Sequence, residues 1–317
     1  MICRGVIAVA LVLGLSGCKR DPQVVSIGIA IPSYVHAVAW VGDEAGHFSR
    51  AGVKTKVAVL GGSAATMRTL IAEQIDVGLA GGDAVLKANA AGADLVIIGG
   101  LVDRFYHRFV AREGIDDADA LRGKRIGLPF LGGPQDMAVK VALGELGLDY
   151  EDDVQVISLG KEFNRMAALH KGEIDATTSQ SPESKLAELG VHVLVDLPAK
   201  PVPFPYLVVA VRRSWLVKHR VDARAVMLGL CTAIREYRAE QDKSLAIIAR
   251  HLGNSDVDGV ARERYRVSGP SLLSLPPEAN VASLQFVLDL MGDTSTDPAV
   301  AVDTSVLDAL VAEGHCR

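Results

Sequence analysis

Residues 61–101 read GGSAATMRTLIAEQIDVGLAGGDAVLKANAAGADLVIIGGL. The spacing of the apolar residues predicts helices over 64–73 and 83–91, and the β-rich runs predict strands over 77–80 and 95–101. A strand that is apolar along its whole length, such as 95–101, is typical of a sheet that is covered on both faces. The alternation of strands with helices indicates an α/β fold built on a mainly parallel sheet.

The same order of elements restarts after residue 123. Sliding the sequence over itself by 99 positions aligns 27–76 with 126–175 without a gap and gives ten identities in 50 positions. The identities, among them Asp76 on Asp175, fall at predicted strand cores, strand ends and inward helix positions, where packing restricts the residue type. The sequence therefore predicts two similar, doubly wound lobes.

Two extended runs, 105–112 and 206–212, predict that the chain crosses between the lobes twice. We expect lobe I to contain 24–104 and 206–317, and lobe II to contain 105–205. Two connections of this kind form a hinge about which the lobes can close. Helical patterns complete lobe I, at 222–252, 278–291 and 304–313.

The composition agrees with a globular α/β protein and excludes several classes. The chain has 317 residues, of which 49% are hydrophobic and 22% charged, so it is neither disordered, collagen-like nor a small disulfide scaffold. Lys and Arg together number 33 against 38 Asp and Glu, which gives a net charge of −5. A protein that binds nucleic acid through an overall basic field is therefore not expected.

The N-terminus has the pattern of a targeting segment. Residues 5–17 form an uninterrupted run of apolar or small residues, which is too short to span a membrane but typical of a secretory signal. The run ends in LSGC at 15–18, which resembles the bacterial lipoprotein cleavage motif. This resemblance implies removal of 1–17, acylation of Cys18 and a short tether at 18–23, and so an extracytoplasmic, lipid-anchored protein. An ordinary signal peptide with a nearby cysteine is the alternative.

Two further cysteines, Cys231 and Cys316, lie far from this segment. An oxidising compartment permits a disulfide between them. Two cysteines so distant in the sequence are weak evidence for a bond, and the sequence leaves their pairing open.

Three stretches carry a resemblance to a known family: 61–101, LRGKRIGLPFLGGPQDMAVKVALGELGLDYEDDVQVISLG at 121–160, and GKEFNRMAALHKGEIDATTSQSP at 160–182. They resemble the extracytoplasmic solute-binding proteins of ABC importers, in the nitrate/sulfonate/taurine and thiamine-precursor branch. The resemblance covers 24–252 and implies a type II periplasmic-binding-protein fold. It also implies a monomeric receptor, not an enzyme, that closes on a small-molecule ligand and delivers it to a permease with its ATPase.

Loops at the carboxyl ends of the predicted strands are where open α/β sheets bind ligands. A helix begins in each loop, so backbone N–H groups face the cleft, and glycines let the backbone approach a solute closely. We expect ligand contacts in these loops and at the second crossover, from Ser33, Tyr34, Gly62, Ser63, Gly82, Asp83, Phe130, Gly133, Gln135, Asp136, Phe163, Asn164, Ser181 and Phe204.

Some of these residues bear on the charge of the ligand. Ser63 and Asp83 are typical N-caps, which would satisfy the free N–H groups of their own helices. Asp83 and Asp136, at predicted helix starts, would place negative charge where an anion would otherwise sit. The pattern favours a ligand with an amine, amide or heteroaromatic ring over the sulfonate or nitrate that the resemblance suggests.

Enzyme motifs are missing from the sequence, which contains no G-x-S-x-G, H-E-x-x-H, Walker A or G-x-G-x-x-G. The histidines show no metal-ligand spacing, and we assign no metal and no cofactor. Two alternatives stay open. One is a lipoprotein that presents its ligand to a sensor. The other is an enzyme on the same fold, of the menaquinone-pathway or pyrimidine-synthase type, although the latter carries a cysteine-rich motif that this sequence lacks.

Overall fold

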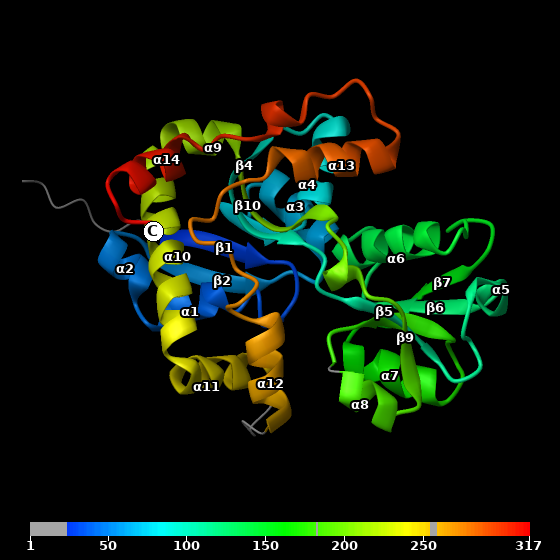
Figure 1. Cartoon of the computed structure of the whole chain (residues 1–317). Coiled ribbons are helices and arrows are strands. Elements are labelled where there is room, and N and C mark those ends of the chain that lie inside the picture. Colours follow the sequence, from blue (N-terminus) through cyan, green and yellow to red (C-terminus); the bar gives the residue numbers. More distant parts are fainter. Residues whose placement is uncertain (1–23, 182, 254–258) are drawn as a thin grey trace, which may run out of the picture.

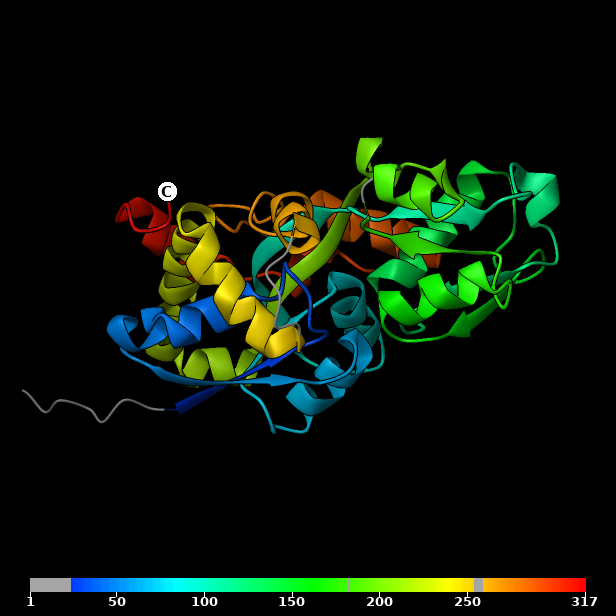
Figure 2. The same cartoon turned by 90° about the horizontal axis from the view of Figure 1, so that it is seen from below.

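The computed structural model describes residues 24–181, 183–253 and 259–317. Two lobes lie side by side, each built on its own five-stranded sheet (Figure 1). The view from below in Figure 2 shows the same two lobes joined by extended chain. The predicted signal peptide at 1–17 and the tether at 18–23, with Cys18, lie outside the described residues.

The sheet of lobe I has the strand order β2-β1-β3-β10-β4. Strand β1 pairs in parallel with β2 and β3, whereas β10 runs antiparallel to both β3 and β4. Strand β3 is buried at every position, as its apolar sequence predicts. The strands are β1 (Val24–Ile29), β2 (Lys54–Val59), β3 (Val77–Ala80), β4 (Leu95–Arg104) and β10 (Pro203–Arg212).

The sheet of lobe II, β7-β6-β8-β5-β9, repeats this arrangement. Strand β6 pairs in parallel with β7 and β8, and β5 runs antiparallel to β8 and β9. The prediction of two similar lobes joined by crossovers is therefore confirmed, and in each sheet the strand in fourth place runs antiparallel to both of its neighbours. The strands are β5 (Arg108–Arg112), β6 (Arg125–Leu128), β7 (Gln155–Ser158), β8 (Ala176–Ser179) and β9 (Val191–Val195). We propose that the lobes divide near the boundaries expected from the sequence, with residues 203–205 belonging to lobe I as the start of β10.

The duplication is visible in equivalent hydrogen bonds. In lobe I the backbone N–H of Ser26 donates to Asp76 Oδ2 at 2.8 Å. In lobe II the backbone N–H of Arg125 donates to Asp175 Oδ2 at 3.0 Å. Both pairs are related by the same shift of 99 residues, so each aspartate holds the backbone of an equivalent strand, β1 in lobe I and β6 in lobe II.

Helices cover the sheets, and the predicted helix over 222–252 is divided at Glu240 into α10 and α11. Helix α12 was not predicted from the sequence. Within the described residues, no helix is both long and apolar enough to cross a membrane. The helices of lobe I are α1 (Val38–Glu44), α2 (His47–Ala51), α3 (Ser63–Ile71), α4 (Gly82–Ala90), α9 (Arg213–Lys218), α10 (Arg220–Ala239), α11 (Gln241–Leu252), α12 (Gly259–Ser268), α13 (Val281–Met291) and α14 (Ser305–Ala312). Those of lobe II are α5 (Ala118–Leu121), α6 (Pro134–Glu145), α7 (Glu162–His170) and α8 (Glu183–Glu188).

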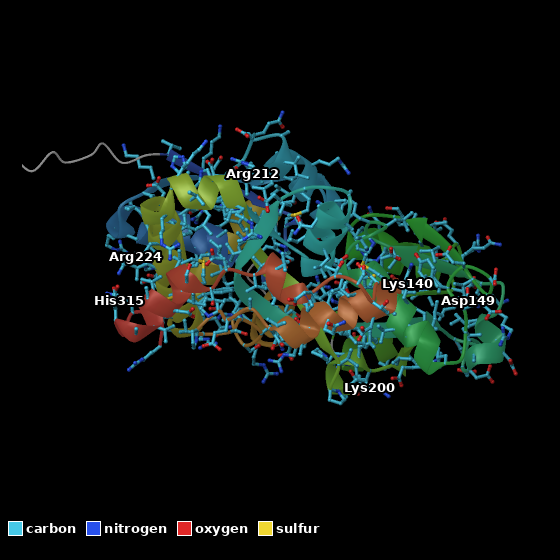
Figure 3. All side chains as sticks on the ribbon, turned by 90° about the horizontal axis from the view of Figure 1, so that it is seen from above. Lys140, Asp149, Lys200, Arg212, Arg224 and His315 are labelled. Atoms are coloured by element: carbon cyan, nitrogen blue, oxygen red, sulfur yellow. A yellow bond between two sulfur atoms is a disulfide. The ribbon has the colours of Figure 1, made fainter. Side chains whose placement is uncertain are left out.

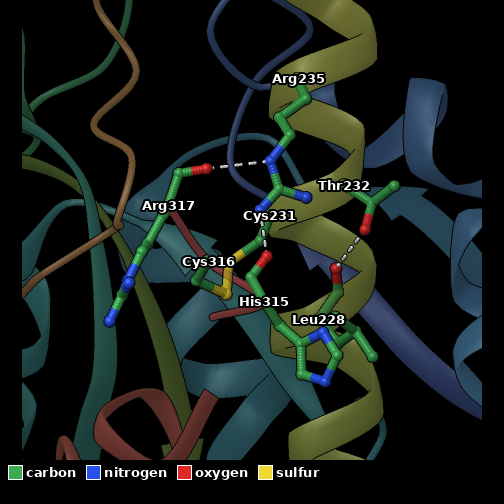
Figure 4. The surroundings of a disulfide bond; sticks show 7 residues. All are labelled: Leu228, Cys231, Thr232, Arg235, His315, Cys316 and Arg317. Carbon is green, nitrogen blue, oxygen red and sulfur yellow. Dashed lines mark hydrogen bonds between the residues drawn. A yellow bond between two sulfur atoms is a disulfide. The ribbon is translucent and has the colours of Figure 1, made fainter. Parts of the chain in front are cut away.

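A disulfide between Cys231 of α10 and Cys316 answers the question that the sequence left open (Figure 4). Arg235, one turn further along α10, donates to the backbone carbonyl of His315 and so holds the same segment. Figure 3 shows His315 at one end of the molecule and Asp149 of lobe II at the other. The bond therefore anchors the C-terminus at the end of lobe I that is remote from lobe II.

Candidate ligand-binding cleft

A cavity of about 330 Å³ lies between the lobes, within the size range of small-molecule sites. Lobe I contributes the chain after β1, the start of α3, the end of β3 and part of β10, and lobe II contributes the loop after β6 and the start of α6. The lining residues are Ala30, Ile31, His36, Gly61, Gly62, Ser63, Ala64, Ala65, Arg68, Gly81 and Tyr206 from lobe I, and Pro129, Phe130, Leu131, Gly133, Pro134, Gln135 and Ser158 from lobe II.

Helices α3 and α6 both begin at the cavity wall. Their N-cap residues are glycines, Gly62 and Gly133, and neither helix receives a hydrogen bond from a capping side chain. Gly62 has φ of +124°, a conformation that side chains rarely adopt, so a glycine is required there. The free first-turn N–H groups of α3 and the positive ends of both helix dipoles favour a hydrogen-bond acceptor or an anion in the cavity.

The prediction that Ser63 and Asp83 are N-caps is wrong. Gly62 and Gly81 occupy the N-cap positions of α3 and α4. The Ser63 hydroxyl instead accepts a hydrogen bond from the backbone N–H of Gly81 at 3.1 Å, which ties the two helix starts together. The N–H groups at the start of α3 are therefore left for a ligand.

His36 is a buried polar side chain on the cavity wall that the sequence analysis did not select. It is 3% exposed and lies between β1 and α1, with Nδ1 2.8 Å from the Ser33 hydroxyl. Its Nε2 has no hydrogen-bond partner among the described residues. Burial lowers the pKa of His36 from 6.5 to about 3, so the imidazole is neutral at physiological pH.

The lobe II wall is backed by a buried positive charge. Gln135 lines the cavity, and its Oε1 accepts from the Thr178 hydroxyl at 2.5 Å and from Arg165 at 3.4 Å. Arg165 is 2% exposed and also donates to the Thr177 hydroxyl and the Gly160 carbonyl, all uncharged acceptors. The Gln135 side chain also hydrogen-bonds Tyr206, so a ligand can bind only the amide N–H that this contact leaves free.

The two carboxylates expected at the site do not line the cavity. Asp83 is fully buried, and Oδ2 lies 3.3 Å from Lys87 Nζ. Burial raises the pKa of Asp83, against the opposing effect of Lys87. Asp136 accepts hydrogen bonds from the Gly132 N–H and the Tyr150 hydroxyl. Each carboxylate thus binds partners in its own lobe, and none of the described residues that line the cavity is an aspartate or glutamate.

One cation lines the cavity from lobe I. Arg68, on α3, is exposed and forms no ion pair with any described residue. Opposite α3, Phe130 is 38% exposed and lies close to Gly62, where an added Cβ would be 3.6 Å from its Cγ. The walls thus combine hydrogen-bond donors and a positive charge with an aromatic face.

Of the predicted contact residues, five line the cavity: Gly62, Ser63, Phe130, Gly133 and Gln135. The others do not, and most are engaged elsewhere or face away. Phe204 is fully buried and stacks on Phe105, Phe163 is 81% exposed, and Ser33 supports His36. The remaining residues that lie outside the lining are Tyr34, Gly82, Asp83, Asp136, Asn164 and Ser181.

A protein-family model described as NMT1/THI5 like matches residues 33–244, about two thirds of the chain. The chain belongs to this family. A curated relative from Brucella abortus, named as a binding protein, is 26% identical over 271 residues, covering 84% of this chain and 82% of the relative.

Solved structures share the fold of this chain. The alkanesulfonate-binding protein SsuA from Xanthomonas axonopodis superposes with a TM-score of 0.70 at 16% identity, covering 90% of this chain and 99% of that one. The nitrate-binding protein NrtA from Synechocystis superposes with a TM-score of 0.71 at 12% identity, covering 94% and 91%. The predicted family and the periplasmic-binding-protein fold are confirmed.

Proposed function

We propose that this protein is the substrate-binding component of an ABC importer, which takes a small solute into the cavity between its lobes and delivers it to a permease. The observation that carries the proposal is the cavity itself, with free helix N–H groups on one wall and donors from the other lobe opposite. Curated relatives named as binding proteins and the sulfonate- and nitrate-binding proteins of the same fold support it.

Hinge closure explains how such a cavity captures a solute. Residues of both lobes line it, so a bound solute contacts both walls only when the lobes are together. A ligand that binds the closed form more tightly shifts the open–closed equilibrium toward it. Only the closed form then presents both lobes in the arrangement that a permease recognises.

The solute we propose carries an acceptor-rich, anionic group such as a sulfonate. The start of α3, Arg68 and the amide of Gln135 all offer donors or positive charge, and Asp83 and Asp136 do not line the cavity. These features favour an anion over the amine, amide or heteroaromatic ligand that the sequence suggested. We assign the contacts to Gly62, Ser63, Gly133 and Gln135, with Phe130 and Arg68, from the cavity lining.

The cellular setting is also a proposal, and the sequence motif at 15–18 is its basis. We propose an extracytoplasmic monomer, anchored to a bacterial membrane through acylated Cys18. The Cys231–Cys316 disulfide suits an oxidising compartment. Mass spectrometry of the membrane-extracted protein should find lipid on an N-terminal Cys18, and Cys18→Ser should release the protein into the soluble fraction.

A ligand panel tests the proposed function. Thermal unfolding of the purified protein is measured with ethanesulfonate, taurine, nitrate, carboxylate analogues, amines and aminopyrimidines, and each active compound is titrated by calorimetry. A ligand at 100 times its dissociation constant adds about 2.7 kcal/mol to stability, which is readily detected. Arg68→Met should weaken binding of anions, whereas Arg224→Met, at the remote end of lobe I, should not (Figure 3). A flat response to the whole panel counts against solute capture.

A further inference from the structure

His36 Nε2 is a buried hydrogen-bonding atom on the wall of the interlobe cavity. It has no partner among the described residues. A buried polar atom without a partner destabilises a protein, so this nitrogen is expected to bind a group that enters the cavity. The other ring nitrogen is already engaged with Ser33.

The role of Nε2 depends on the tautomer of the ring, which carries one proton when neutral. If the Ser33 hydroxyl donates to Nδ1, the proton resides on Nε2 and the ring offers a donor to the cavity. If Nδ1 donates to Ser33, Nε2 is an acceptor. The Ser33 contact, at 2.8 Å, is compatible with both directions.

The surroundings of the cavity separate these two tautomers. The first turn of α3 and Arg68 present N–H groups to the same space, and no described lining residue is a carboxylate. A solute that satisfies those groups has to bring acceptor atoms. An acceptor at Nε2 would meet these atoms lone pair to lone pair, whereas an Nε2–H would bind one of them.

We propose that His36 donates an Nε2–H hydrogen bond to an acceptor oxygen of the solute, and that Ser33 is the positioning residue that fixes this tautomer. The proposal rests on the proposed function, because it concerns the same cavity. It narrows the ligand class to solutes with an oxygen acceptor beside the α3 terminus. It also gives Ser33 a place in the site although Ser33 does not line the cavity.

The neutrality of the ring has a consequence for selectivity. A protonated histidine would attract any anion by charge, but this ring stays neutral well below physiological pH because it is buried. Recognition at this point is therefore by direction and distance of a hydrogen bond. Solutes that present a donor or a methyl group in place of the oxygen should be rejected.

The tautomer can be measured without any ligand. Nitrogen-15 NMR of the histidine rings, with His36 assigned from the spectrum of His36→Gln, should show a protonated Nε2 and an unprotonated Nδ1 at pH 7. Ser33→Ala should shift this pattern toward a mixture of tautomers, and Ser33→Thr, which keeps the hydroxyl, should restore it. A protonated Nδ1 in the wild-type protein would overturn the proposal.

Binding of ethanesulfonate provides the second measurement. His36→Phe keeps a ring but removes both nitrogens and should weaken binding by about 10- to 100-fold, the usual effect of losing a hydrogen bond to a charged group. His36→Gln keeps an amide N–H near the Nε2 position and should lose far less. His192→Phe is the matched control, because His192 of β9 does not line the cavity and its Nε2 already donates to the Ile115 carbonyl at 2.9 Å.

The outcomes separate this proposal from the proposed function. Wild-type affinity in His36→Phe, or equal losses in His36→Phe and His36→Gln, would overturn the role of His36 while leaving solute capture intact. If no compound of the panel binds the wild-type protein, the proposed function fails instead. In that case the NMR measurement still decides the tautomer on which this inference depends.

Discussion

Gly81→Ala tests whether the two lobes meet at the cavity as the structure describes. Gly81 is the N-cap of α4 and has an extended backbone, with φ of −67° and ψ of 138°, so alanine can adopt its conformation without strain. An added Cβ would lie 2.7 Å from Cγ and 3.1 Å from Cδ of Pro134. Pro134 belongs to lobe II, so the methyl group would press on a rigid ring across the lobe interface.

The size of the effect follows from this contact. Carbon atoms pack best at about 3.5–4.0 Å, so the Pro134 ring has to retreat by roughly 1 Å. Overpacking of this kind usually costs about 1–3 kcal/mol. Opening the hinge relieves the clash with Pro134, so this penalty falls on the closed form. The dissociation constant of ethanesulfonate should rise by about 5- to 150-fold.

The assay pairs calorimetry with X-ray scattering and thermal unfolding of the ligand-free protein. Scattering should report a more open molecule for Gly81→Ala, and the unfolding temperature without ligand measures the strain that stays inside lobe I. The added Cβ would also lie 2.3 Å from Asp83 Oδ1, inside lobe I, and this second clash has to be separated from the first. Pro134→Ala in the Gly81→Ala background removes the ring and should recover most of the binding.

Gly144→Ala is the matched control, since it makes the same change on lobe II helix α6 where an added Cβ meets nothing within 4 Å. It should leave binding unchanged and stabilise the helix slightly. The reasoning is refuted if Gly81→Ala lowers the unfolding temperature but keeps wild-type affinity, or if removal of the Pro134 ring restores nothing. Either result would mean that lobe I absorbs the strain.

Three further predictions concern stability. Replacing both Cys231 and Cys316 by alanine should lower the free energy of unfolding by about 4 kcal/mol, because the bond closes a segment of 85 residues. Denaturant titration measures this change, and a loss of ligand affinity instead of stability would contradict the remote position of the bond. Burial holds the pKa of His36 at about 3 in the folded protein, against 6.5 in the unfolded chain. Acidification from pH 7 to 5 therefore protonates this ring only in the unfolded chain and should lower the free energy of unfolding by about 2 kcal/mol. His36→Gln should lose less stability between these pH values, and an equal loss would be inconsistent with a neutral buried ring. Asp175→Ala should destabilise the ligand-free protein by about 2 kcal/mol, because the carboxylate accepts hydrogen bonds from the Arg125 N–H and from Arg112. Urea unfolding checks this, with Asp175→Asn, which keeps an acceptor, as the comparison. Equal stability of the wild type and Asp175→Ala would refute it.

The local sequence determined the elements and their order. A strand that is apolar along its whole length, such as 95–101, is stable only when both of its faces are buried. Such strands predict a sheet that is covered on both faces, and no distant residue is needed for this prediction. The shift of 99 residues identified the second lobe because equivalent packing positions, such as Asp76 and Asp175, make equivalent hydrogen bonds. Helix α12 was missed, since it is rich in charged residues and has few apolar positions that would indicate a buried face.

The lining of the cavity was predicted only in part, and for a physical reason. Residues such as Gly62 and Gly133 could be selected because the starts of helices after parallel strands meet at one edge of a sheet. The direction of a side chain within such a loop is decided by its partners, which come from elsewhere in the chain. Asp136 is held by the Gly132 N–H and the Tyr150 hydroxyl and does not line the cavity, which its position in the sequence could not show.

Sequence alone thus established an α/β protein of two repeated lobes, since these depend on periodicity and residue type along the chain. Its family was identified from the resemblance to known sequences. The tertiary structure alone decided the electrostatics of the cavity, the pairing of Cys231 with Cys316 and the open hydrogen-bonding position of His36. Each of these is set by atoms that are close in space but distant in the chain. Burial and pairing depend on distances between atoms in space, and these distances cannot be read from the order of the residues in the chain.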